Sequence, residues 1–269
     1  MGHAILRFYP LFSIQGTLNK DTVLYHIFPC SRFKEMIKNR KLYFRKVSRW
    51  ADTYEYPIRF MPEDRKNSIK NGLFGFCLTE KYDKEAMWKL YSGNDKYGVC
   101  IKTTVSSICN ALKDIVKYPP PLDFNNNAFI GRVCYVPYLE NHPERMFEED
   151  SRYEYPDYMY PAFLKRDAFS YEEEVRIILH YINFRSHMPD DGLYQELSDF
   201  SFIDEIILSP YCTEGDKTEI NNFCREHEIF VPVSQSEFLK TIDEDSVSLP
   251  EEEKVYWGSP QGAYGINSL

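Results

Sequence analysis

The stretch that decides the fold is "FSYEEEVRIILHY", residues 169–181, which reads as a buried β-strand but begins with three consecutive carboxylates. Its apolar residues alternate as one face of a strand does, at Val175, Ile177 and Leu179. The same alternation places a polar set on the opposite face, namely Glu172, Glu174 and Arg176. That face either meets solvent as an ion-paired surface or lines a cleft.

Apolar runs with turn signals between them lie on both sides of this stretch, and their periods predict a sheet with short helices. Strands are expected over 22–28, 41–47, 72–80, 97–103, 131–138, 203–210 and 229–235. Helices are expected over 31–40 with Ser31 as cap, 83–92 with Asp83 as cap, 104–116, near 160–168, and over 214–227. The sequence therefore predicts an α+β fold: a single domain over 1–236 with a mixed, mainly antiparallel sheet, followed by an acidic and then glycine-containing tail over 237–269.

The amino-acid composition limits the classes of protein to which this chain can belong. The chain has 269 residues, 43% of them hydrophobic, which suffices for a sizeable core. A net charge of −9 argues against unspecific nucleic-acid binding by the whole surface. However, residues 31–49 contain eight basic residues and one acid, which suits either a phosphate-bearing ligand or a solvated helix face.

Cysteine usage and hydropathy indicate a cytoplasmic protein. The seven cysteines are odd in number, contain no C-x-x-C, and mostly lie in apolar runs, as reduced core thiols do. No apolar run reaches the roughly 18 residues that a membrane span needs, so no membrane partner is expected. Metal-ligand spacing is absent too, and no metal site is predicted.

The familiar phosphate, nucleophile and zinc motifs are missing, which leaves polar residues embedded in strands as the candidate site. His26, Thr79, Trp88 and Tyr91 each have a plausible structural role as well as a functional one. Glu172 and Glu174 are the most informative pair. Two carboxylates in one cleft can stabilise an oxocarbenium-like transition state while orienting a nucleophile.

An ordered series of short motifs over about residues 23–210 resembles a bacterial family, domain of unknown function 2971. The matching stretches are "LYHIF", "KLYF", "WADTYE", "FCLTE", "MWKLYS", "YGVCI", "VCY", "KRDAFSYEEEVR" and "IDEIILSP". This chain has Phe169 where the family more often has Trp, and Trp50 in a loop that differs from the usual Phe-Asn-Asp-Pro.

That family in turn looks like a distant relative of the ADP-ribosyltransferases, and this resemblance implies their fold and a site for NAD as substrate. His26 would hold a ribose, Thr79 or Tyr91 would match the middle position, and Glu172-x-Glu174 would be the catalytic pair with Glu174 at the anomeric carbon. Trp88 or Tyr91 would stack on nicotinamide. The remaining NAD contacts would come from Arg45, Arg49 and Arg176.

The implied function is cleavage of the nicotinamide–ribose bond, with transfer of ADP-ribose to a macromolecule or to water, in bacterial defence or as a toxin. An acidic, tyrosine-rich stretch at 139–161 slightly favours a protein acceptor over a nucleic acid. Two alternatives stay open. One is a non-catalytic nucleotide- or partner-binding module, and the other is a metal-dependent nuclease that uses Asp52, Glu172 and Glu174.

Overall fold

The computed structural model describes residues 12–14, 18–50, 72–112, 127–136, 160–180 and 190–239. The chain divides into two compact units, Met1–Phe238 and Leu239–Leu269. The tail expected over 237–269 therefore lies almost entirely outside the described residues. None of the helices in the described part of the chain has the length and apolar character needed to cross a membrane.

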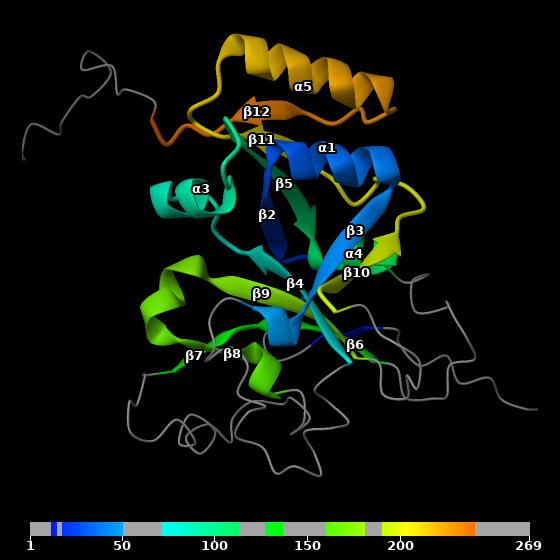
Figure 1. Ribbon diagram of the computed structural model, residues 1–269, viewed down its shortest axis with the longest axis vertical. Helices are drawn as coiled ribbons and strands as arrows, with labels where there is room; N and C mark the ends of the chain where they lie inside the picture. The colour runs from blue at the N-terminus through cyan, green and yellow to red at the C-terminus, as the bar shows by residue number, and fades with distance from the viewer. Residues whose placement is uncertain are drawn as a thin grey trace, which may run out of the picture. The chain divides into compact units, whose positions relative to one another are not determined.

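The described residues of the first unit form twelve strands with short helices between them (Figure 1). The strands are β1 (Phe12–Ile14), β2 (Val23–Pro29), β3 (Lys41–Lys46), β4 (Leu73–Thr79), β5 (Gly98–Thr104), β6 (Asn127–Arg132), β7 (Cys134–Val136), β8 (Leu164–Arg166), β9 (Glu174–His180), β10 (Gly192–Glu196), β11 (Glu205–Leu208) and β12 (Val233–Gln235). The α-helices are α1 (Cys30–Asn39), α3 (Glu85–Tyr91), α4 (Val105–Leu112) and α5 (Glu214–Glu226), and the 3-10 helices are η1 (Val47–Arg49), η6 (Tyr160–Phe163) and η7 (Asp167–Glu172).

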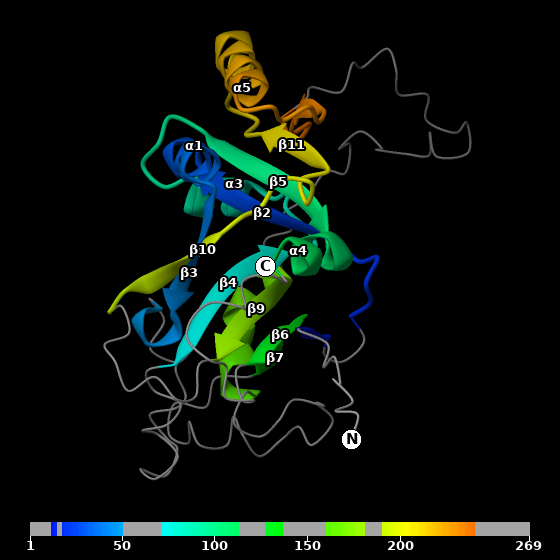
Figure 2. The same ribbon diagram turned by 90° about the vertical axis from the view of Figure 1, so that its right-hand side faces the viewer.

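Ten strands form one sheet in the order β1-β6-β9-β4-β2-β5-β11-β12, with β3 attached to β4 and β10 attached to β3. Most pairs are antiparallel, whereas β1–β6 and β11–β12 are parallel. This arrangement confirms the predicted α+β fold with a mixed, mainly antiparallel sheet. Figures 1 and 2 both show α5 beside the β11–β12 end and the β6–β9 pair at the other end.

Burial explains the sequence patterns of the strands. In β3 the buried residues Leu42 and Phe44 alternate with the exposed Tyr43 and Arg45, as expected for a strand with one covered face. By contrast, every residue of β9 is buried, because β4 and β6 flank it and both sheet faces are covered. The polar face predicted for this strand therefore lies inside the protein rather than at its surface.

Several local expectations differ from the structure. The run at 131–138 is split between β6 and β7, and the helix expected near 160–168 is replaced by η6 and β8. Ser31 does not cap α1: the helix begins at Cys30, and the backbone N–H of Ser31 instead donates to the Asp95 carboxylate at 2.6 Å. Nor does Asp83 cap α3, since it accepts a hydrogen bond from the Trp88 indole at 3.3 Å.

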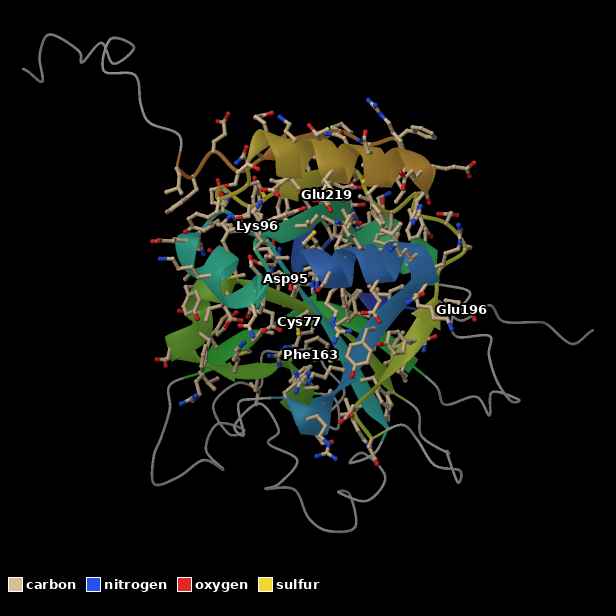
Figure 3. The ribbon with its side chains drawn as sticks, turned by 45° about the horizontal axis from the view of Figure 1, so that its top comes forward. Cys77, Asp95, Lys96, Phe163, Glu196 and Glu219 are labelled. Atoms are coloured by element: carbon tan, nitrogen blue, oxygen red, sulfur yellow. The ribbon has the colours of Figure 1, made fainter. Side chains whose placement is uncertain are left out.

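The sheet forks along one edge of β4. On one side β4 pairs with β9 over its whole length. On the other side it pairs with β3 near its start, at Gly75, and with β2 only at its end, where Thr79 lies opposite Tyr25. Helix α1 joins β2 to β3, and the two strands diverge from β4 in both views (Figures 1 and 2). Between these two contacts, β4 borders an open space at Phe76 and Cys77 (Cys77 is labelled in Figure 3).

Candidate functional site

A groove of about 1020 Å³ opens at this fork. Residues of β2, α1, β3, β4 and β10 line it, and Glu174 of β9 and Lys165 of β8 contribute to its wall. A small adjoining cavity of about 40 Å³ shares His26, Tyr91 and Glu174 with the groove and adds Thr79 and Glu172. Thus polar residues from five separate elements reach one region of the protein.

Glu172 and Glu174 come together, but not as two residues on the same face of one strand. Residues 167–172 form the 3-10 helix η7, and the strand begins only at Glu174. Between them Glu173 has a φ of 42°, in the left-handed region that few non-glycine residues adopt. A strand that continued through this residue would place its side chain on the apolar face with Val175. Instead, the Glu173 carboxylate forms ion pairs with Lys84 at 2.9 Å and Lys81 at 3.2 Å.

Glu172 is held by its carboxylate and by its backbone. Its Oε2 accepts hydrogen bonds from the Tyr91 hydroxyl at 2.8 Å and from Lys165 Nζ at 2.7 Å. Its carbonyl accepts a hydrogen bond from the Thr79 hydroxyl at 2.6 Å. Burial and the neighbouring Glu172 charge raise the pKa of Tyr91, so its hydroxyl keeps the proton that it donates.

Glu174 is surrounded by cations. Its two carboxylate oxygens each accept a hydrogen bond from Arg176, from Nε and Nη2 at 2.9 Å, and Oε2 also contacts Lys165 Nζ at 3.2 Å. Its backbone N–H donates to the Tyr135 hydroxyl at 2.9 Å. Burial alone would raise the pKa of Glu174, but the Arg176 and Lys165 charges lower it to about 2, so the carboxylate is ionised at neutral pH.

Arg176 is an interior residue and does not line the groove. It is fully buried, and besides Glu174 it donates to the carbonyl of Ala162 at 2.8 Å. Its guanidinium lies 4.3 Å from the centre of the Trp50 ring. Arg176, which was expected to contact NAD, therefore lies beside Glu174 and away from the groove wall, because strand residues two apart share a face and this face is covered.

His26 borders both cavities. Its Nδ1 contacts the carbonyl of Cys77, and its ring stacks on Phe76 with centroids 4.4 Å apart. A carbonyl only accepts hydrogen bonds, so Nδ1 carries the proton and Nε2 is left as an acceptor. Burial lowers the pKa of His26 to about 4, despite the opposing effect of this hydrogen bond, and the ring is neutral at physiological pH.

Of the other residues that were expected to contact the ligand, two line the groove and two do not. Tyr91 and Arg45 line the groove and are exposed on it. Trp88 instead is fully buried in a cluster with Ile27 and Cys100, because the apolar side of α3 packs onto the sheet. Arg49 lies outside the groove wall, where its Nε donates to the carbonyl of Asp190 at 3.3 Å.

Sequence reasoning missed three residues of the site: Lys165, Tyr135 and Trp50. Lys165 was detectable as the first of two bases directly after the apolar run "PAFL", a position where a buried charge needs a partner. Trp50 packs over Gly75, where an added Cβ would lie 2.4 Å from the indole, so a glycine at this position makes room for the ring. Tyr135 gave no signal, because its partner is a backbone N–H from a distant segment.

Two expectations fall outside the described residues: Asp52, and nearly all of the acidic stretch at 139–161. Within the described ranges, no group of three or more His, Cys, Asp or Glu residues is arranged to hold a metal ion. The seven cysteines, all of which are described, are free thiols.

The fold and the groove define an α+β protein with paired buried carboxylates at the fork of its sheet. Residues 87–177 match the model of a family described as "Protein of unknown function (DUF2971)", which confirms the family resemblance seen in the sequence. This match contains Tyr91, Lys165, Glu172 and Glu174.

Among curated proteins, none matches the chain significantly. Among solved structures, the chain is similar to DarT from Thermus sp. 2.9 in complex with NAD+, with 9% identity and a TM-score of 0.38 over 81% of this chain and 97% of that one. The same protein in complex with ADP-ribosylated ssDNA is 11% identical, with a TM-score of 0.38 over 82% of this chain and 96% of that one.

Proposed function

We propose that this protein is an NAD-consuming, ADP-ribosyltransferase-like enzyme that cleaves the bond between nicotinamide and ribose. The observation that carries the proposal is the groove at the fork of the sheet, which ends on a buried and permanently ionised carboxylate, Glu174, with Glu172 beside it. The motif series resembles domain of unknown function 2971, and that family looks like a distant relative of the ADP-ribosyltransferases. This resemblance supports the same chemistry.

The groove suits a dinucleotide in size and composition. Ligand pockets for small molecules commonly have volumes of roughly 300–1,000 Å³, and this one is about 1020 Å³. Tyr43 and Tyr194 lie on its wall with ring centroids 5.0 Å apart, and their exposed faces offer a surface for a flat base. Arg45 is exposed on the same wall and has no ion pair among the described residues, so it is suited to bind a pyrophosphate.

His26, Glu174 and Glu172 each have a separate role in the proposed reaction. His26 Nε2 accepts a hydrogen bond from a ribose hydroxyl, and its neutral ring adds no positive charge beside the developing cation. Glu174 stabilises the positive charge that spreads over C1′ and O4′ as the C1′–N bond breaks. The electron pair of that bond goes to the pyridine nitrogen, so nicotinamide leaves neutral. An acceptor hydroxyl then attacks C1′, and Glu172 takes its proton.

The two alternatives make different demands on the same residues. In a metal-dependent nuclease, Glu172 and Glu174 would be ligands, but here both carboxylates contact the Lys165 ammonium, which a divalent cation would have to displace. A protein that only binds a nucleotide would need the groove but not the two carboxylates at its end. The buried charge of Glu174 is costly to maintain, and a catalytic role explains it better than binding alone.

The test is to incubate the purified protein with NAD and measure free nicotinamide. We expect release by the native protein and a loss of about 100-fold or more in Glu174→Gln, because the stabilising charge is removed. Glu173→Gln is the matched control: it makes the same change at the next residue, whose carboxylate pairs with surface lysines, and should retain activity. Binding of NAD without release, or no binding, would overturn the proposal.

The fate of ADP-ribose is read from the same reaction with NAD labelled in its adenine. Free labelled ADP-ribose identifies water as the acceptor. Label that remains on added single-stranded nucleic acid, or on added protein, after denaturation identifies a macromolecular acceptor. Glu172→Gln should lower transfer more than it lowers binding of NAD, since Glu172 acts on the acceptor.

A further inference from the structure

The ammonium group of Lys165 bridges the two carboxylates. Its Nζ lies 2.7 Å from Glu172 Oε2 and 3.2 Å from Glu174 Oε2. Lys165 is 7% exposed and borders the groove. The reaction proposed above gives Lys165 no role, although burying a third charged group beside an ion pair is costly.

The accessory sheet β7–β8 delivers Lys165 to this position. The two strands run parallel, and Tyr135 of β7 lies opposite Lys165 of β8, so their side chains share one face. Both reach Glu174: Tyr135 accepts a hydrogen bond from its backbone N–H, and Lys165 contacts its carboxylate. A small two-stranded sheet thus fixes the first residue of β9 from outside the main sheet.

Electrostatics gives the bridge a consequence. Because both oxygens contact one nitrogen, the two carboxylates are close neighbours, and without the ammonium their mutual repulsion would push them apart. Arg176 holds Glu174 in place in any case, through two hydrogen bonds at 2.9 Å. Within the described residues Glu172 has no hydrogen bond to Arg176, and it would retain the Tyr91 hydroxyl as a neutral partner. The loss of Lys165 would therefore act mainly on Glu172.

We propose that Lys165 is a positioning residue for the reaction described above: its ammonium holds Glu172 beside Glu174, so that Glu172 is aimed at the acceptor while Glu174 faces C1′. This inference rests on the proposed function. A general base must lie within hydrogen-bond reach of the proton that it takes, so the position of Glu172 decides the transfer step. Among the described residues, the charged and titratable groups around the pair include Lys165, Arg176, Tyr91, Tyr135, Cys77 and His26.

The test compares Lys165→Met, Lys165→Arg and Lys84→Met by the kcat and KM of nicotinamide release in the steady state. Lys165→Met should lower kcat by about 10- to 100-fold and leave KM for NAD within about three-fold. Lys165→Arg keeps the charge and should restore most of kcat. Lys84→Met is the matched control, since Lys84 binds the same 3-10 segment at the Tyr171 carbonyl (2.6 Å) and at Glu173 (2.9 Å), outside the groove.

The outcomes separate this inference from the proposed function. A native protein that releases no nicotinamide overturns the proposed function, whatever the variants do. An active native protein with an unchanged kcat in Lys165→Met overturns the role of Lys165 alone. Equal losses in Lys84→Met and Lys165→Met would also overturn it, because they would show a structural role. If Lys165→Met does not fold, Lys165→Arg decides: a near-native kcat supports the proposal, and a low kcat in a folded variant refutes it.

Discussion

Replacing Glu174 by Gln should destabilise the protein as well as stop its reaction. The change leaves the Arg176 guanidinium, which is fully buried, without its anionic partner. Removing one member of a buried ion pair commonly costs about 3–5 kcal/mol. Arg176 keeps its hydrogen bond to the Ala162 carbonyl and its contact with the Trp50 ring, so we expect the lower end, about 3 kcal/mol.

Urea unfolding followed by circular dichroism at pH 7.5 measures this cost. For a slope of about 2 kcal/mol per M, the unfolding midpoint should fall by roughly 1.5 M. Glu173→Gln is again the control, because its ion pairs are partly exposed, and it should change the free energy of unfolding by less than about 1 kcal/mol.

A double variant separates stability from catalysis. In Glu174→Gln/Arg176→Met the uncompensated charge is removed, and most of the lost stability should return because an apolar side chain suits the buried position. Nicotinamide release should stay absent. If the single variant loses less than about 1 kcal/mol, or if the double variant is no more stable than the single one, the Glu174–Arg176 pair is not what fixes the start of β9.

Three further predictions follow from other contacts. Tyr91→Phe removes one donor to Glu172 and should slow nicotinamide release about ten-fold while costing about 1 kcal/mol of stability; unchanged kinetics would count against Tyr91 as part of the site. Gly75→Ala forces a Cβ to within 2.4 Å of Trp50 and should cost about 1–3 kcal/mol, measured as a lower Tm; a native Tm would show that the indole moves freely. His26 and His180, whose pKa values burial lowers to about 4, take up protons in the unfolded chain first, so stability should fall as pH drops from about 6.5 towards 4; a urea midpoint that is constant over this range would contradict it.

The sequence by itself determined the class of fold and much of its core. The alternation in "KLYFRK" and the apolar runs that became β2, β4 and β5 placed those strands within one or two residues, because side-chain period and turn residues act locally. It also singled out His26, Glu172 and Glu174, since a polar residue inside an apolar run stands out whatever its partners are. By the same reasoning Glu174 and Arg176 were placed on one face, and they form an ion pair there.

Only the tertiary structure decided what these residues contact. The left-handed turn at Glu173 broke the strand alternation on which the pairing of Glu172 with Glu174 had been based, and Lys165 from β8 brought the two carboxylates together instead. The structure likewise turned Arg176 from an expected ligand contact into a buried partner. The physical reason is that the fork of the sheet and the accessory strands join segments far apart in the chain, and no periodicity within one segment encodes such contacts.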